Sequence, residues 1–179
     1  WHVDTASVNH VLPGAAWNRT VTFSPDSRLV AAVTFTFMVR VWEVETGEKI
    51  AEFGRIGDGL GTFQSLRFSP DGNWLASGAY RQIVVWETRG FTVRHVVQGL
   101  SSPLVDSLEF SPDSRWIAGY ADEPEFRMRL LNIETGKIDL ELPTGIALTA
   151  AFSSDGRWFA TGVRGPNWDN YEPAMQFWD

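Results

Sequence analysis

The chain contains no cysteine, only three histidines and no long apolar run, and each absence removes a class of function. Without cysteine there is no disulfide framework, no thiolate nucleophile and no thiolate metal site. The three histidines follow no His-x-x-x-His or comparable spacing, so the sequence predicts no metal centre. No segment approaches the roughly 20 apolar residues of a membrane-spanning helix, so a membrane role is not expected.

Positive charge is also scarce. Lysine and arginine number 15 against 22 aspartates and glutamates, which gives a net charge of −7. Binding to nucleic acid or to an anionic membrane requires a basic face, so we expect neither as a partner. The glycines at 57, 59 and 61 lack the Lys-Ser/Thr pair of a phosphate-binding loop, and no cofactor is predicted. Hydrophobic residues make up 44% of the 179 residues, enough for a sizeable core.

The most informative feature present is an internal repeat. Phe-Ser-Pro-Asp begins at Phe23, Phe68 and Phe110, and Phe-Ser-Ser-Asp begins at Phe152, at spacings of 45, 42 and 42 residues. A second landmark keeps the same period, at Trp42, Trp86, Leu131 and Trp178. A period in the low forties, with four short apolar runs per unit, is typical of a β-propeller blade. The sequence predicts an all-β fold of about four blades, each a four-stranded antiparallel sheet, with on the order of 12 or more strands and almost no helix.

The second unit shows how each blade is divided. Strands are expected at residues 65–68, 74–77, 83–86 and 92–97, with a turn at 69–72. The run 83–86 is continuously apolar, which predicts that both faces of this strand are covered. We therefore expect Trp42, Trp86, Leu131 and Trp178 to be mostly buried. The aligned residues Leu29, Trp74, Trp116 and Trp158 are expected to act as wedges between blades.

These motifs resemble the WD-repeat β-propeller family, of the kind common in bacteria. The resemblance rests on Phe-Ser-Pro-Asp-Gly, on the Leu-Ala-Ser that follows it, and on Trp-Glu or Trp-Asp before Thr-Gly. It implies a hydrogen-bonded tetrad of His, Asp, Ser/Thr and Trp in each blade. The chain lacks the tetrad histidine, and Arg81-Gln82 stands where the turn aspartate is expected. The tetrad is therefore expected to be incomplete, and apolar packing must contribute more to the stability of each blade.

The recurring aspartates Asp26, Asp71, Asp113 and Asp155 occupy the same place in each unit. Aspartate at this position of a turn bonds to its own backbone, so we interpret all four as turn-forming residues rather than catalytic ones. No unit carries a distinct His, Asp or Glu cluster or a Gly-x-Ser-x-Gly elbow. We therefore expect no catalytic residue and no enzyme activity in this chain.

The loops that join the second and third strands vary in length, and loops on a rigid scaffold commonly carry recognition. The loop at 163–174 combines aromatic and acidic residues, which serve either to bind a partner or to fold back on the blade. In the fold predicted, these loops share one rim with those joining the fourth strand to the next first strand. The candidate binding residues on this rim are Arg55, Asp58, Arg81, Asp122, Glu123, Glu125, Arg127, Arg164, Trp168, Asp169, Tyr171 and Glu172.

The repeat phase divides the chain into units of approximately 1–42, 43–86, 87–131 and 132–179. It predicts a lone fourth strand at 8–12, three blades' worth of strands and a last blade of three strands. Rings of this family commonly have seven or eight blades, so we expect further blades from a longer chain or from a second copy. A small four-bladed ring remains open, and the segment alone is expected to self-associate.

Three functions are open at this point. The favoured one is a non-catalytic scaffold or sensor module that binds a protein or peptide, within a larger multidomain protein. The second is the propeller part of a hydrolase or oxidoreductase whose catalytic residues lie outside this segment, since a fold alone does not decide function. The third is a self-assembling structural unit. Neither the absence of cysteine nor any motif fixes the cellular compartment.

Overall fold

The computed structural model describes residues 8–12, 20–34, 36, 38–54, 65–79, 82–98, 108–121, 127–144, 146–164 and 174–179. These residues form 15 β-strands in four antiparallel sheets, and none of them is helical. No helix that could cross a membrane occurs among them. The all-β prediction is confirmed.

Each sheet follows the order of its strands along the chain, and we call the four sheets blades 1 to 4. Blade 1 consists of β1 (Val21–Phe23), β2 (Leu29–Val33), β3 (Val39–Glu43) and β4 (Lys49–Phe53). Blade 2 consists of β5 (Ser65–Phe68), β6 (Trp74–Ala79), β7 (Gln82–Glu87) and β8 (Thr92–Gln98). Blade 3 consists of β9 (Glu109–Phe110), β10 (Trp116–Ala121), β11 (Arg127–Asn132) and β12 (Lys137–Leu142). Blade 4 has three strands, β13 (Ile146–Phe152), β14 (Phe159–Arg164) and β15 (Ala174–Trp178).

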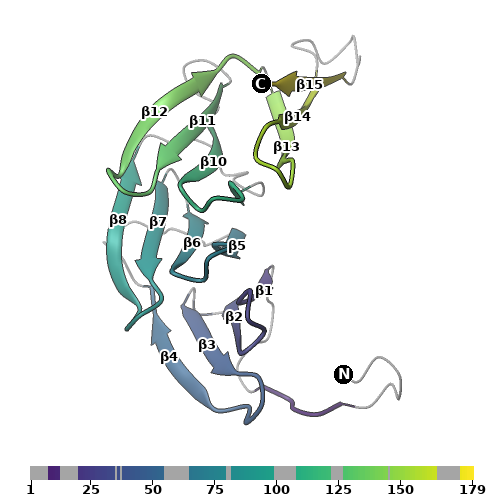
Figure 1. Ribbon diagram of the computed structural model, residues 1–179. Coiled ribbons are helices and arrows are strands. Elements are labelled where there is room, and N and C mark those ends of the chain that lie inside the picture. Colours follow the sequence, from purple (N-terminus) through teal and green to yellow (C-terminus); the bar gives the residue numbers. More distant parts are fainter. Residues whose placement is uncertain are drawn as a thin grey trace.

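The blades follow one another around an open crescent, with β1, β5, β9 and β13 on its inner side and β4, β8 and β12 on its outer side (Figure 1). Each inner strand contacts the inner strand of the next blade. Blades 1 and 4 lie apart at the two ends of the crescent (Figure 1). This radial arrangement of small antiparallel sheets is that of a β-propeller.

The strand boundaries predicted for the second unit agree with β5 to β8 to within two residues. The expected strand at residues 8–12 is wrong, because this segment pairs with no sheet among the described residues. It lies instead against blade 1, where Leu12 packs on Val30 and Trp42. A strand requires a neighbouring edge as well as an apolar pattern, and no described strand pairs with this segment.

Three apolar clusters hold the blades together, one at each junction. We call the side of a blade toward the preceding blade its N-facing side, and the side toward the following blade its C-facing side. At the first junction the C-facing Val39 and Val41 of blade 1 meet the N-facing Leu66, Phe68 and Trp86 of blade 2. The second and third junctions repeat this arrangement between blades 2 and 3 and between blades 3 and 4. Both faces of the central strands are therefore covered, as their continuous apolar runs predicted.

Trp42, Trp86 and Leu131 are each 1% exposed, so the burial expected for them is observed. Trp178, expected to be mostly buried, is only half-buried. Trp158, expected to be a wedge, is 41% exposed. The physical reason is the same for both corrections, because no described strand covers the outer edge or the C-facing side of blade 4. Trp74 and Trp116 pack into the second and third junctions as expected.

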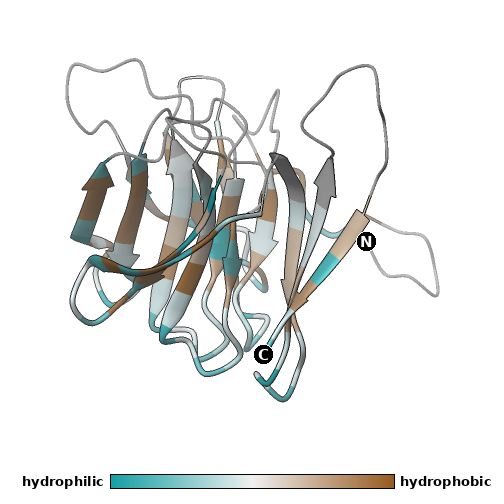
Figure 2. Cartoon of the chain, turned by 90° about the horizontal axis from the view of Figure 1, so that it is seen from above, coloured by the Kyte–Doolittle hydropathy of each residue, from teal (hydrophilic) through white to brown (hydrophobic). Residues whose placement is uncertain are grey.

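The connections between strands fall on two rims of the crescent. One rim carries the turns from first to second strands and from third to fourth strands, and Figure 2 shows these turns in teal and white. The opposite rim is where second strands end and third strands begin. We call the two the turn rim and the loop rim.

Candidate protein-interaction surface

The turn rim is built from one hydrogen-bonded motif used four times. In each copy the serine hydroxyl donates to the aspartate two residues later, at 2.5–2.6 Å, in the pairs Ser24–Asp26, Ser69–Asp71, Ser111–Asp113 and Ser153–Asp155. The same serine oxygen accepts a backbone N–H five residues on, as from Trp74 to Ser69 at 2.9 Å. The four carboxylates are thus engaged within their own turns, as their interpretation as turn-forming residues requires.

These hydrogen bonds also change the acidity of the carboxyl groups. The serine hydroxyl, followed by the backbone N–H two residues on, lowers the pKa of Asp26, Asp113 and Asp155. At Asp71, partial burial acts to raise the pKa, but hydrogen bonds from Ser69 and Asn73 outweigh it and the pKa is lowered. A lowered pKa favours a fixed anion over a group that exchanges protons near neutral pH.

The last residue of this turn adopts a left-handed conformation. Glycine holds that place at Gly72 and Gly156, with φ of 75° and 70°, but serine holds it at Ser27 and Ser114, each with φ of 60°. Glycine adopts this region without strain, whereas serine does not. Ser114 gains a compensating contact, because its hydroxyl oxygen accepts the backbone N–H of Asp71 in the neighbouring blade at 3.0 Å. The turns of blades 2 and 3 are therefore joined at this rim.

Two of the candidate binding residues fall on described strands, at strand ends on the loop rim. Arg127 begins β11, and its Nη1 lies 3.8 Å from Oε2 of Glu141. Arg164 ends β14, opposite Ile146 of β13. Ten candidates lie outside the described residues: Arg55, Asp58, Arg81, Asp122, Glu123, Glu125, Trp168, Asp169, Tyr171 and Glu172.

The lengths of the connections distinguish this rim from the turn rim. Residues 80–81 join β6 to β7, residues 122–126 join β10 to β11, and residues 165–173 join β14 to β15. On the turn rim, by contrast, the connections differ by at most two residues in length: 24–28, 69–73 and 111–115 have five residues each, 153–158 has six, and 44–48, 88–91 and 133–136 have five, four and four. In a repeat protein whose connections are similar on one rim and differ on the other, the binding residues are expected in the loops of the variable rim.

Ion pairs near the loop rim recur in alternate blades. Nη2 of Arg40 donates to Oε1 of Glu52 at 3.0 Å in blade 1, and Nε of Arg129 lies 2.8 Å from Oε1 of Glu141 in blade 3. Hydrogen bonds from Arg40, and then from Lys49, lower the pKa of Glu52 to about 2. Sequence reasoning missed these pairs. The available signal was that Arg-Val-Trp-Glu, from Arg40, and Arg-Leu-Leu-Asn, from Arg129, occupy the same position of two repeats.

A second contact that sequence reasoning missed uses two of the three histidines. His95 on β8 is hydrogen-bonded through Nε2 to the carbonyl oxygen of Ile133 in blade 3, at 2.8 Å. His10 makes a similar bond in blade 1, at 2.9 Å, to the carbonyl oxygen of Glu45, which is one residue beyond the counterpart of Ile133. Both rings lie against the glycine of a Thr-Gly turn, Gly136 and Gly47 respectively. Residues 8–12 therefore lie against the Thr-Gly turn of blade 1 in the way that the outer strand β8 of blade 2 lies against the Thr-Gly turn of blade 3.

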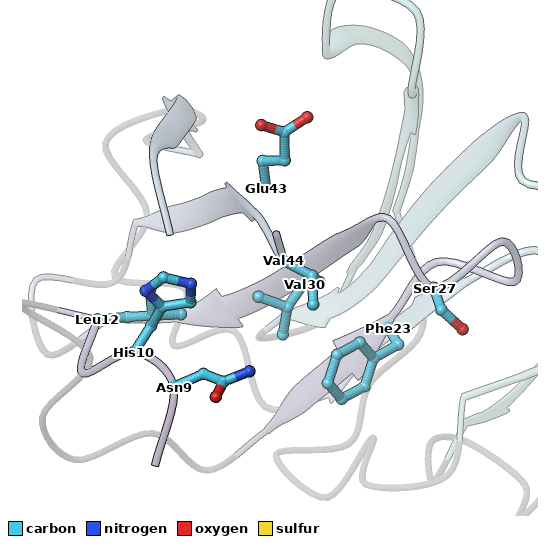
Figure 3. Close-up of a pocket in the computed structure, with 8 residues that line it drawn as sticks. All are labelled: Asn9, His10, Leu12, Phe23, Ser27, Val30, Glu43 and Val44. Carbon is cyan, nitrogen blue, oxygen red and sulfur yellow. The ribbon is translucent and has the colours of Figure 1, made fainter. Parts of the chain in front are cut away.

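A pocket of about 460 Å³ lies on the N-facing side of blade 1. Figure 3 shows His10 and Leu12 on one flank, Val30 in the middle and the Phe23 ring on the other flank. Phe23 corresponds to Phe68 and Phe110, which are buried in the junctions, yet Phe23 is 58% exposed. The pocket is thus an uncovered blade face with one apolar flank, rather than a cavity with converging polar groups.

The motif that sequence comparison detects agrees with this geometry. The family model described as WD domain, G-beta repeat, matches residues 60–87, which contain the turn motif, Leu75 and Trp86. Residues 60–87 thus match a WD repeat, and the described residues as a whole have a β-propeller fold. In blade 4 the WD-repeat pairing of tryptophan with the second-strand hydroxyl is present, because Trp178 Nε1 donates to Thr161 Oγ1 at 3.2 Å.

Among solved structures, this chain is similar to Kuenenia stuttgartiensis hydrazine synthase, with a TM-score of 0.70 and 16% sequence identity. The alignment covers 86% of this chain and 45% of that chain, so this chain spans less than half the length of that structure. At this identity the likeness shows the fold alone. No functionally curated protein matches the chain.

Proposed function

We propose that this chain is a non-catalytic interaction module, a scaffold or sensor part of a larger protein, that binds a protein or peptide on its loop rim. WD repeats generally mediate protein interactions, and this supports the class of function. The observation that carries the choice of rim is the contrast in connection length: the turns of one rim have four to six residues each, whereas the connections of the other rim lengthen from blade 2 to blade 4.

The scaffold beneath that rim is suited to the role. Three buried junctions fix the strand ends from which the variable connections leave. A rigid base lowers the entropy lost when a loop binds its partner. The proposed contact residues are those of the loops of blades 3 and 4, with Trp168 and Tyr171 as aromatic anchors and Arg127 at their edge. The net charge of −7 favours a partner with basic or neutral contact residues.

An enzymatic role is the alternative, and the hydrazine synthase likeness does not favour it beyond the shared fold. Among the described residues no group of three or more His, Asp or Glu could hold a metal ion. The turn carboxylates are held by their own serines. These observations give the enzymatic alternative no specific site.

The test is to select peptides from a displayed library on the purified chain and to measure their affinity for variants. Trp168→Ala and Tyr171→Ala should each weaken binding about tenfold or more, as expected for aromatic anchors. Asp155→Asn on the turn rim is the matched control and should leave affinity unchanged. Selected peptides that lose affinity with Asp155→Asn, but not with the loop variants, would contradict the assignment of the rim.

A further inference from the structure

One position in the turn between the third and fourth strands differs in kind between the blades. Glycine holds it at Gly47 and Gly136, with φ of 72° and 68°, but phenylalanine holds it at Phe91, with φ of 52°. The three residues each stand five positions after the landmark of their repeat, which is Trp42, Trp86 or Leu131. We call this the turn position. A bulky side chain rarely adopts a left-handed backbone, so Phe91 must be stabilised by its surroundings.

Where the turn position is glycine, a histidine ring fills the space beside it. A Cβ atom on Gly136 would lie 2.7 Å from Cε1 of His95, which belongs to the preceding blade. A Cβ atom on Gly47 would lie 2.9 Å from Nδ1 of His10. Both distances are shorter than the contacts that Cβ atoms make, so each ring requires a residue without a side chain in the turn.

The residue that faces the turn position comes from the outer strand of the preceding blade (Figure 1). In blade 2 it is His95 on β8, which is opposite Val85. In blade 1 the same place on β4 is opposite Val41 and holds Ala51. We call this the strand position. Ala51 has a single methyl group, so it leaves open the space that the His95 ring fills at the next junction.

Phe91 fills that space from the turn side. Its ring stacks on the Phe53 ring, with the ring centres 5.2 Å apart and the planes 20° apart. Both rings, and Ala51 with them, pack against the apolar cluster of the first junction. The first junction therefore has a small residue at the strand position and a large one at the turn position, whereas the second junction has the reverse.

The hydrogen bonds of the two junctions differ in the same sense. His95 is hydrogen-bonded through Nε2 to the carbonyl oxygen of Ile133 at 2.8 Å. The counterpart of Ile133 in blade 2 is Thr88, whose carbonyl oxygen accepts the backbone N–H of Gly90 at 3.0 Å. Alanine at the strand position has no side-chain donor, and the turn that faces it supplies a donor of its own.

We propose that the strand and turn positions select which blade packs on which. A blade with glycine at the turn position accepts a ring from the preceding blade, and blade 2, with Phe91, accepts only a small residue. The wrong order would place the His95 and Phe91 rings in one space, or would leave a cavity between Ala51 and Gly136. The apolar clusters of the three junctions are alike in residue type, so they distinguish the blades less.

Such a selection has a use in a chain of similar repeats. Incorrect packing between repeats is a characteristic failure of repeat proteins, and a steric mismatch at one position disfavours it. The proposal is independent of the peptide-binding function, because that function uses the loop rim and these contacts lie at the turns of the opposite rim.

The first test transfers the His–Gly pair to the first junction and measures melting temperature. Ala51→His alone should lower it by about 4 °C or more, because the new ring meets Phe91. Phe91→Gly alone should lower it by about the same amount, because the stack on Phe53 is lost. The double variant should melt above both single variants, because the histidine ring then faces a glycine.

The second test transfers the Ala–Phe pair to the second junction. Gly136→Phe should lower the melting temperature by about 4 °C or more, because the new side chain meets the His95 ring. Adding His95→Ala should raise it again. The control combines Ala51→His with Gly136→Phe, which lie at different junctions, so their shifts in melting temperature should add.

The comparison of matched and unmatched pairs decides the proposal. It would be overturned if Ala51→His with Phe91→Gly melts no higher than the more stable of its single variants, or if His95→Ala does not raise the melting temperature of Gly136→Phe. Where a single variant does not fold, folding of its matched double variant is the expected result. A matched double variant that also fails to fold would overturn the proposal.

Discussion

The internal junctions and the two ends of the crescent use the same repeat positions with opposite results. Phe110 is 6% exposed at a junction, whereas Phe23 in the same position at an end is 58% exposed. Trp116 packs into the third junction, and Trp158 at the end lies open with the Arg157 guanidinium 5.2 Å from its ring centre. In a repeat protein the sequence shows which repeat positions are apolar, but whether such a position is buried depends on the presence of a neighbouring blade.

The largest effect is expected where a tryptophan fills a junction. Trp86→Ala removes a side chain packed between blades 1 and 2, with Phe53 5.2 Å from its ring centre. It should lower the free energy of unfolding by about 3–5 kcal/mol, because it loses burial and leaves a cavity. Trp158→Ala at the end of the crescent should cost about 1 kcal/mol or less. A denaturant titration measures both, and a loss below about 1 kcal/mol for Trp86→Ala would show that the core is misplaced.

A smaller effect is expected where a histidine ring meets a glycine turn. Gly136→Ala places a methyl group into the His95 ring at a residue with φ of 68°, so both a steric clash and backbone strain result. Gly156→Ala has nearly the same φ, 70°, but no atom within 4 Å of the new methyl group. We expect about 1 kcal/mol for Gly156→Ala and roughly 1–2 kcal/mol more for Gly136→Ala.

The control for that pair is the double variant His95→Ala with Gly136→Ala. Removing the ring should relieve the clash, so the two costs should be less than additive. Additive losses of unfolding free energy would mean that the His95 ring and the Gly136 turn are not in contact. The packing of β8 against blade 3 described above would then be wrong.

The smallest effect concerns acid stability. The pKa values of Asp26, Asp71, Asp113 and Asp155 are lowered in the fold, so their contribution is present above the unfolded value of about 3.9 and is lost as the pH falls through the folded values. Burial raises the pKa of Glu109, opposed by the charge of Arg67, and this one group favours the fold slightly as the pH falls. The four aspartates outnumber it, so stability should drop below about pH 4.

Between about pH 5 and 7 stability should be nearly constant, because the four turn aspartates are already ionised there. Melting temperature measured across both ranges checks this expectation. Asp113→Asn should reduce the acid-dependent part, because the amide does not titrate. A steep change between pH 5 and 7, or an unchanged acid response in Asp113→Asn, would contradict the assignment.

Much of the fold could be predicted from the sequence because the repeat is regular. The Phe-Ser-Pro-Asp motif and the Trp42 and Trp86 positions locate the strands, and alternate faces follow from the pleat. The half-burial of Trp178 and the exposure of Trp158 could not be predicted in this way, since they depend on which blade lies beside blade 4. The same holds for residues 8–12, whose apolar pattern predicts a strand only if an edge is available.

The candidate site was less predictable. Loop composition indicates a recognition surface on one rim, but the recognition residues it names follow no period that would fix their contacts. The bonds from His10 and His95 to neighbouring turns join residues that are 35 and 38 positions apart in the sequence. Because the two partners of each bond belong to different repeats, a motif search within one repeat does not find them. Comparing equivalent positions of alternate units would have revealed them.

The comparison of Phe110 with Phe23 tests the central claim most directly, because the two residues share one repeat position and differ in whether a blade covers them. The measurement is the free energy of unfolding of Phe110→Ala and Phe23→Ala in dilute protein. The account predicts a loss of about 3 kcal/mol or more for Phe110→Ala and less than about 1 kcal/mol for Phe23→Ala. Equal losses in the two variants would contradict it, because burial would then not depend on the neighbouring blade.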